Sequence, residues 1–268
     1  MFKLCLNMEL TKNVMKWGNS AGILLPKEWL GNQVKIILIN RTLEIKKEVL
    51  SILEPYLEDI LGIYLVGSYA RGEQEEDSDI DIIVISSKTK KEIISGKYHI
   101  SISPLEGINK TINSYPELII PRMREAKVIL NPQLLEEIKE HKLTKKSFKN
   151  FVEDTRSMIK IDKEFIALDE LNGENLESNS IIYSMMLRLR GIFLINCILK
   201  QKQYSKKDFK KWVLNVLDEE EFENAYAAYK AIRDKKQEKI VISLTTAKKL
   251  QGFLIKELKS LGEKQHDK

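Results

Sequence analysis

The sequence predicts an α+β protein of three parts, on three observations. Residues 1–46 hold short apolar runs separated by Gly, Asn and Pro, the pattern of a small β-rich module. Residues 47–142 alternate short strands with helices, which is typical of a domain with a mixed sheet. Residues 143–268 are helical in pattern almost without a break, which predicts a bundle of about five helices.

Composition narrows the class of protein. Of the 268 residues, 43% are hydrophobic and 31% charged, so the chain can bury a core. Its net charge of +5 is compatible with nucleotide or nucleic-acid partners. With only Cys5 and Cys197 as cysteines and three histidines, we expect neither a disulfide framework nor a Cys/His zinc site.

The apolar segments favour a cytoplasmic protein. The first ten residues have too short an apolar run, and no small-residue cleavage site, for a signal peptide. The longest apolar segment, residues 181–199, carries Arg188 and Arg190 near its middle, which makes it a poor membrane span. We therefore expect a cytoplasmic location and no membrane partner.

The N-terminal module is predicted to contain three strands, at residues 10–17, 22–25 and 34–39. A turn at residues 18–20 joins the first two, and Pro26 opens a short helical turn that runs to Leu30. A unit this short cannot bury a core alone. We therefore expect it to form a homodimer.

A family resemblance supports this expectation. The segment from Met15 to Ile36 resembles the AbrB-like swapped-hairpin family of transcriptional regulators and antitoxin DNA-binding domains, through its residues 17–20 and 26–28. The resemblance implies an interlocked dimer in which Lys12 and Lys16 reach DNA. Leu24 stands where many DNA-binding members carry Arg, so a dimerisation element without DNA contact is the alternative.

The middle domain alternates helices and strands. Helices are predicted at 47–61, at 117–124 and at 133–140, with Pro55 kinking or dividing the first, and a first helical turn at 68–72. Strands are predicted at 63–66, 79–85, 98–103 and 127–130, and residues 86–91 are expected to be a polar loop.

Residues 66–84 contain the candidate phosphate-binding and metal-binding residues. Asp79 and Asp81 flank one isoleucine at the start of a strand, so their side chains point to the same face while Ile80 and Ile82 point into the core. Two neighbouring carboxylates repel each other unless a cation lies between them, and oxygen ligands suit Mg²⁺. Gly67-Ser68 follows an apolar strand, where free N–H groups can bind phosphate. These features suit phosphoryl or nucleotidyl transfer.

Gly67-Ser68, Arg71-Gly72 and Asp79-Ile80-Asp81 together resemble the nucleotidyltransferase superfamily of the DNA polymerase β type, including minimal and aminoglycoside nucleotidyltransferases. The resemblance covers about residues 47–141. It implies that Asp79 and Asp81 hold Mg²⁺, that Gly67 and Ser68 bind the β- and γ-phosphates of an NTP, and that Arg71 adds charge to the triphosphate site.

One departure concerns a third carboxylate. Active members of that superfamily usually present an acid from the next strand, and residues 98–103 contain none. His99 or Ser101 would take its place, and Glu106 is the nearest acid beyond the strand. The alternative is that Asp79 and Asp81 lie at a solvated strand end beside the acidic loop.

The apolar helix predicted at 180–199 contains Arg188 and Arg190. A buried arginine needs an anionic partner. Either one of them faces the cleft and meets a phosphate or an acceptor, or both pair with carboxylates inside the bundle.

The preferred function is a Mg²⁺-dependent nucleotidyltransferase that moves a nucleoside monophosphate from an NTP to an acceptor hydroxyl with release of pyrophosphate. The acceptor would be a protein, an RNA end or a small molecule, bound with help from the helical bundle. The alternative is a DNA-binding regulator or antitoxin-like protein whose transferase domain senses nucleotide or is inactive.

Overall fold

The computed structural model describes residues 10, 12, 14–36, 41–75, 78–236 and 238–262. The chain divides into two compact units, Met1–Ile45 and Lys46–Lys268, and each is described by itself.

The N-terminal unit contains one small hairpin. Strand β1 (Met15–Trp17) pairs antiparallel with β2 (Ser20–Gly22), and Gly18 has the positive φ of 59° that the turn requires. The 3₁₀ helix η1 (Lys27–Trp29) follows Pro26, as predicted. Both strands are shorter than predicted. Residues 34–36 do not form a strand, and residues 37–39 of the predicted third strand lie outside the described residues.

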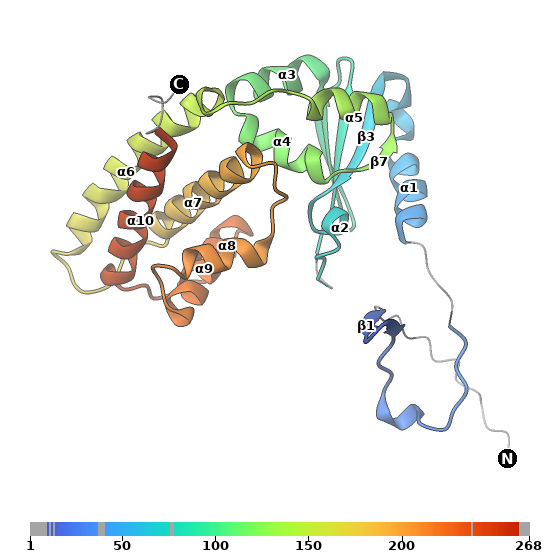
Figure 1. Cartoon of the computed structure of the whole chain (residues 1–268), viewed down its shortest axis with the longest axis horizontal. Helices are drawn as coiled ribbons and strands as arrows, with labels where there is room; N and C mark the ends of the chain where they lie inside the picture. The colour runs from blue at the N-terminus through green and yellow to red at the C-terminus, as the bar shows by residue number, and fades with distance from the viewer. Residues whose placement is uncertain are drawn as a thin grey trace. The chain divides into compact units, whose positions relative to one another are not determined.

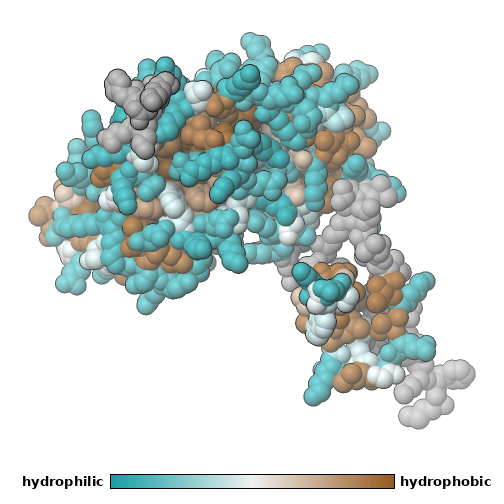
Figure 2. All heavy atoms as spheres, viewed as in Figure 1, coloured by the Kyte–Doolittle hydropathy of each residue, from teal (hydrophilic) through white to brown (hydrophobic). Residues whose placement is uncertain are grey.

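The described part of this unit has no buried core. Several of its large apolar side chains are more than half exposed, among them Trp17 at 62%, Leu24 at 58%, Leu30 at 78% and Ile36 at 68%, whereas Trp29 is half-buried (Figure 2). A two-stranded hairpin without a covered apolar face is marginally stable in water, which explains why the strands are short.

The second unit is built on a mixed five-stranded sheet with strand order β5-β6-β4-β3-β7 (Figure 1). Strand β4 runs parallel to β6, and the other neighbours are antiparallel. The strands are β3 (Ile60–Val66), β4 (Ile80–Ser86), β5 (Lys91–Ser95), β6 (Tyr98–Pro104) and β7 (Lys127–Leu130). The four strands predicted in this region are confirmed, and β5 was not predicted.

Both faces of the sheet are buried. Figure 1 shows helix α1 (Arg41–Ile52) on one side and helices α3 (Leu105–Ser114) and α4 (Pro116–Glu125) on the other. Leu65 and Ile82 are buried on one face, and Ile83 and Ile85 on the face that also carries Asp81. The expected division into one core face and one polar face therefore holds only at the start of β4, where Asp81 lies.

The remaining helices of this half follow the predicted pattern. Helix α1 gives way to the 3₁₀ helix η2 (Glu54–Asp59), so Pro55 does divide the predicted helix. Helix α5 (Pro132–Lys139) follows β7. Helix α3 was not predicted.

The C-terminal half is a bundle of five helices, as predicted. They are α6 (Lys149–Asp169), α7 (Ser180–Leu199), α8 (Lys206–Val213), α9 (Glu219–Arg233) and α10 (Leu244–Gly262), with the short η3 (Lys145–Phe148) before them. By length and composition α7 could cross a membrane. In the structure it packs against α4, α6, α9 and α10, and it is the central helix of the bundle.

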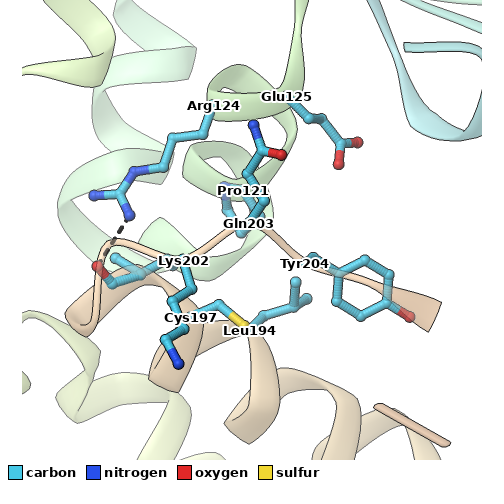
Figure 3. Close-up of a pocket in the computed structure, with 9 residues that line it drawn as sticks. Pro121, Arg124, Glu125, Leu194, Cys197, Lys202, Gln203 and Tyr204 are labelled. Carbon is cyan, nitrogen blue, oxygen red and sulfur yellow. Dashed lines mark hydrogen bonds between the residues drawn. The ribbon is translucent and has the colours of Figure 1, made fainter. Parts of the chain in front are cut away.

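One hydrophobic core joins the sheet to the bundle. It runs from Tyr64 and Ile83 through Met123 of α4 to Leu189 of α7 and Leu254 of α10. The junction also contains a hydrogen bond of 2.9 Å, which the Arg124 guanidinium donates to the carbonyl oxygen of Ile198 (Figure 3). The two halves therefore pack as one body, and α4 and α7 form the junction.

Candidate active site

The site begins where β3 passes directly into the short helix α2 (Gly67–Arg71). Gly67 has a φ of 73°, and Val66 before it pairs with Asp81 of β4. A Cβ atom on residue 67 would overlap Oδ2 of Asp81. Glycine is therefore required twice, for its left-handed conformation and for the close approach of the carboxylate to the backbone.

Asp79 and Asp81 stand at the start of β4. Asp79 precedes the strand and is exposed, whereas the side chain of Asp81 is 33% exposed. Burial raises the pKa of the Asp81 carboxyl above its usual value. The positive charges of Arg122 and His99 oppose this, and the negative charge of Asp79 adds to it. The two aspartates therefore interact electrostatically, as the sequence predicts for a cation site.

Arg71 lies beside these residues but is already paired. Its Nη1 donates to both carboxylate oxygens of Glu125 at 2.8 Å, and its Nε donates to Glu73 at 2.7 Å. The backbone N–H of Gly67 donates to the same Glu125 carboxylate at 3.0 Å. Glu125 thus occupies two groups that the sequence assigns to the triphosphate. Ser68, in the first turn of α2, is half-buried.

His99 lies directly opposite Asp81 on the neighbouring strand β6. Its Nδ1 is 4.0 Å from Oδ1 of Asp81, and its Nε2 is 3.4 Å from Oε2 of Glu92 on the edge strand β5. The second oxygen of Glu92 accepts a hydrogen bond of 2.7 Å from the Ser101 hydroxyl. The position where the sequence lacks a third acid therefore holds an imidazole, with a carboxylate one strand further out.

The donor set fits Mg²⁺ bound together with a nucleotide. Mg²⁺ commonly takes one or two carboxylates and completes its shell with water and phosphate oxygens. Asp79 and Asp81 supply two such carboxylates, and the carboxylate of Asp81 packs against the backbone of Gly67. Among the described residues, no group of three or more acidic, His or Cys side chains could hold a metal ion without such help.

Sequence reasoning missed three residues of this site. Glu125 and Arg122 come from the last turn of α4, and Glu92 comes from a strand that was not predicted. Their positions depend on how distant elements pack, and no local pattern marks them. The predicted DNA-contact residues Lys12 and Lys16 are both exposed on the N-terminal unit.

Comparison with known proteins agrees with this geometry. A family model described as a nucleotidyltransferase domain matches residues 43–168. A protein of Methanocaldococcus jannaschii, with the provisional name protein adenylyltransferase, is 38% identical over 73 aligned positions, which cover 23% of this chain and 71% of that protein. The chain belongs to the nucleotidyltransferase-domain family.

Two crystal structures are similar over most of the chain. A nucleotidyltransferase-like protein from Exiguobacterium sibiricum matches with 11% identity and a TM-score of 0.38, covering 81% of this chain and 75% of that one. The spectinomycin adenyltransferase AAD(9) from Enterococcus faecialis matches with 17% identity and a TM-score of 0.43, covering 81% of this chain and 99% of that one.

Proposed function

We propose that the chain is a Mg²⁺-dependent nucleotidyltransferase, which moves a nucleoside monophosphate from an NTP to an acceptor hydroxyl. The observation that carries this proposal is the packing of the Asp81 carboxylate against the Gly67 backbone, with Asp79 beside it. In this proposal the Gly67 backbone binds phosphate, and the two carboxylates beside it bind the metal ion. The family assignment supports the same reaction class.

In the proposed reaction, the acceptor oxygen forms a bond to the α-phosphorus and the hydroxyl loses its proton. The bond from the α-phosphorus to the bridging oxygen breaks, and pyrophosphate leaves with the electron pair. Asp79 and Asp81 would hold Mg²⁺, which when bound supplies positive charge to offset the phosphate charge. Gly67 and Ser68 would orient the β- and γ-phosphates. Positioning and charge are most of what the protein contributes to such a reaction.

Arg71 has a structural part in this proposal. Its bond to Glu125 holds α2 against α4, and its bond to Glu73 joins it to the loop that follows α2, so Arg71 fixes the turn proposed to bind phosphate. The Glu125 carboxylate lies on the Gly67 N–H, where a phosphate oxygen would bind. A nucleotide phosphate would therefore have to displace Glu125 from that N–H.

Calorimetric titration with ATP, GTP, CTP and UTP in the presence of Mg²⁺ tests the proposal. We expect at least one NTP to bind, and binding to disappear in Asp79→Asn and Asp81→Asn. Glu164→Gln, which removes an exposed carboxylate from α6, is the matched control and should bind normally. If the wild-type chain binds no NTP, the proposal is wrong. ATP is the first choice, because two relatives are named for adenylyl transfer.

For the N-terminal unit, we propose self-association as an AbrB-like homodimer. The exposed apolar side chains of Trp17, Leu30 and Ile36 support this, because a second copy would cover them. Lys12 and Lys16 are exposed and would be the DNA contacts of the second candidate function, a DNA-binding regulator with a nucleotide-sensing domain. A salt-dependent gel shift that is lost in Lys12→Ala/Lys16→Ala would favour that candidate.

A further inference from the structure

A cavity of about 360 Å³ lies at the junction of the sheet and the bundle. Helix α4 forms one wall and α7 the other, and Arg71 and Tyr204 stand at one end. Figure 3 shows the neighbouring part of the junction, where Tyr204, in the segment after α7, and Glu125 of α4 are drawn as sticks. The volume is in the range that binds small molecules.

The lining of this cavity is positively charged. Four arginines, Arg71, Arg122, Arg188 and Arg190, face two glutamates, Glu117 and Glu125, which leaves an excess of two positive charges. Glu125 is fully engaged by Arg71. The remaining arginines have little carboxylate charge left to pair with in the lining.

Two buried polar atoms in the cavity lining have no hydrogen-bond partner in the part of the chain that the structure describes. They are Nε of Arg188, a donor, and Oε2 of Glu117, an acceptor when ionised. Leaving such atoms unpaired costs free energy, so a ligand that pairs both gains affinity. The matching ligand carries an acceptor for Arg188 and a hydroxyl that can donate to Glu117.

Arg190 is held in place by aromatic side chains. Its guanidinium lies 5.5 Å from the centre of the Tyr204 ring, and Tyr204 and Tyr229 are close enough to raise its pKa against the opposing effect of burial. The Arg71 guanidinium is also 5.5 Å from the Tyr204 ring centre. Tyrosine contacts fix a guanidinium without neutralising it, so Arg190 keeps its full charge for a ligand.

The cavity extends away from the proposed phosphate site. Arg71 and Arg122 are close enough to Asp81 to lower the pKa of its carboxyl against the larger effect of burial. Glu117 lies eight residues before Glu125 on α4, which is about 12 Å along the helix at 1.5 Å per residue. A ligand bound to Arg188 and Glu117 therefore lies in a cavity that extends along α4 to Arg71 and Arg122, the lining residues that lie near Asp81.

We propose that this cavity binds the acceptor, and that the acceptor is a small hydroxylated anion whose phosphate or carboxylate group is held by Arg188 and Arg190. That the bound anion is the acceptor rests on the proposed nucleotidyl transfer. The binding of an anion in this cavity does not depend on that proposal. A cationic or neutral acceptor would leave the Arg190 guanidinium with only its tyrosine neighbours, whereas Arg188 also lies near the carboxyls of Glu117 and Asp162.

Four sugars of similar size and different charge test this. The full chain, with its nucleotide site filled by Mg²⁺ and α,β-methylene-ATP, is titrated in a calorimeter with glucose 6-phosphate, glucuronate, glucose and glucosamine. We expect the two anions to bind at about 10 mM or below, and glucose and glucosamine not to bind. The two anions show whether phosphate or carboxylate is preferred.

Variants of the two arginines test whether the anion binds in this cavity. Arg188→Ala and Arg190→Ala should weaken anion binding by about tenfold or more, which is the loss of one charge-assisted hydrogen bond. Arg188→Lys and Arg190→Lys retain the positive charge and should lose less affinity for the anion. They replace the alanine variants in this test if an alanine variant does not fold. Arg156→Ala, which removes an exposed arginine from α6, is the matched control and should bind like the wild type.

The outcomes separate the two proposals. Asp81→Asn should lose NTP binding and keep anion binding, whereas Arg188→Ala should do the reverse. Equal binding of all four sugars, or no binding of either anion at about 10 mM, would overturn the anionic acceptor. A loss of NTP binding in Arg188→Ala without a loss of anion binding would show that the cavity takes the nucleotide instead.

Discussion

At the scale of single residues, the structure shows which atoms the residues of the predicted nucleotide motif contact. The spacing of Gly67, Ser68, Asp79 and Asp81 predicts a nucleotide site, and the structure brings Gly67 and Asp81 into contact. The structure adds a reason for Gly67: its backbone lies where a Cβ atom would meet the Asp81 carboxylate. Glu125 could not be predicted, because it reaches Gly67 and Arg71 from another helix, more than fifty residues along the chain.

The first prediction uses two glycines with positive φ. Gly67→Ala should abolish NTP binding, because its Cβ would push Asp81 away. Gly72 has a φ of 74° and open space around it, so Gly72→Ala carries only the cost of the left-handed backbone, about 1–2 kcal/mol. Calorimetric NTP titration and thermal unfolding of both variants check this. Equal NTP affinity in the two variants would contradict it.

The second prediction concerns Glu117. Burial raises the pKa of this carboxyl from 4.5 to about 7. The folded state then holds a proton that the unfolded state releases, so the free energy of unfolding falls as the pH rises from about 4.5 to about 7. The loss is about 3 kcal/mol for a shift of this size.

Glu117→Gln should remove this slope. Urea unfolding of the wild type and the variant at pH 5, 6 and 7 measures it. Burial also raises the pKa of Asp162, to about 6, but that carboxyl is unchanged in the variant, and the difference between the two proteins isolates Glu117. Parallel stability curves would show that Glu117 keeps its ordinary pKa.

At the scale of elements, most helices and strands follow from the sequence, and the exceptions have clear causes. The predicted polar loop, residues 86–91, ends at the first residue of β5 (Lys91–Ser95), a strand that was not predicted and in which two of five residues are charged. It forms an edge strand, where polar side chains reach solvent. This strand brings Glu92 beside His99, so the missed element also explains the missed site residue.

The third prediction compares two helical glycines. Gly252 of α10 has open space around it, so Gly252→Ala should stabilise the protein by about 0.5–1 kcal/mol through helix propensity. Gly191 of α7 packs against the Phe151 ring, and a Cβ there would overlap it. Gly191→Ala should therefore destabilise the protein in spite of the same propensity gain. Thermal unfolding measures both, and a gain in both would contradict the packing of α6 on α7.

At the scale of the whole molecule, the sheet and the bundle share one core, whereas Ile45 of helix α1 is the only buried residue among those described in the N-terminal unit. The sequence predicts a boundary near residue 142, because the pattern there becomes purely helical. Patterns in the sequence do not reveal that Met123 of α4 and Leu189 of α7 belong to one core, since that depends on packing between distant segments.

The fourth prediction separates the two units. Removal of residues 1–40, which keeps helix α1 and its buried Ile45, should leave NTP affinity and the unfolding temperature of the remaining chain unchanged, because the rest of the buried core lies in Lys46–Lys268. It should convert the proposed dimer to a monomer. Light scattering after size-exclusion chromatography, with calorimetry, checks both. A dimer that persists after the removal would place the interface on the larger unit.

Helix α4 contacts the proposed nucleotide site through Glu125 and lines the cavity through Glu117. An element common to two binding sites makes them parts of one thermodynamic cycle. If a bound nucleotide changes the affinity for the anion by some factor, the anion must change the affinity for the nucleotide by the same factor. The two ligands therefore cannot be tuned independently through α4, and a substitution that alters this coupling alters it equally in both directions.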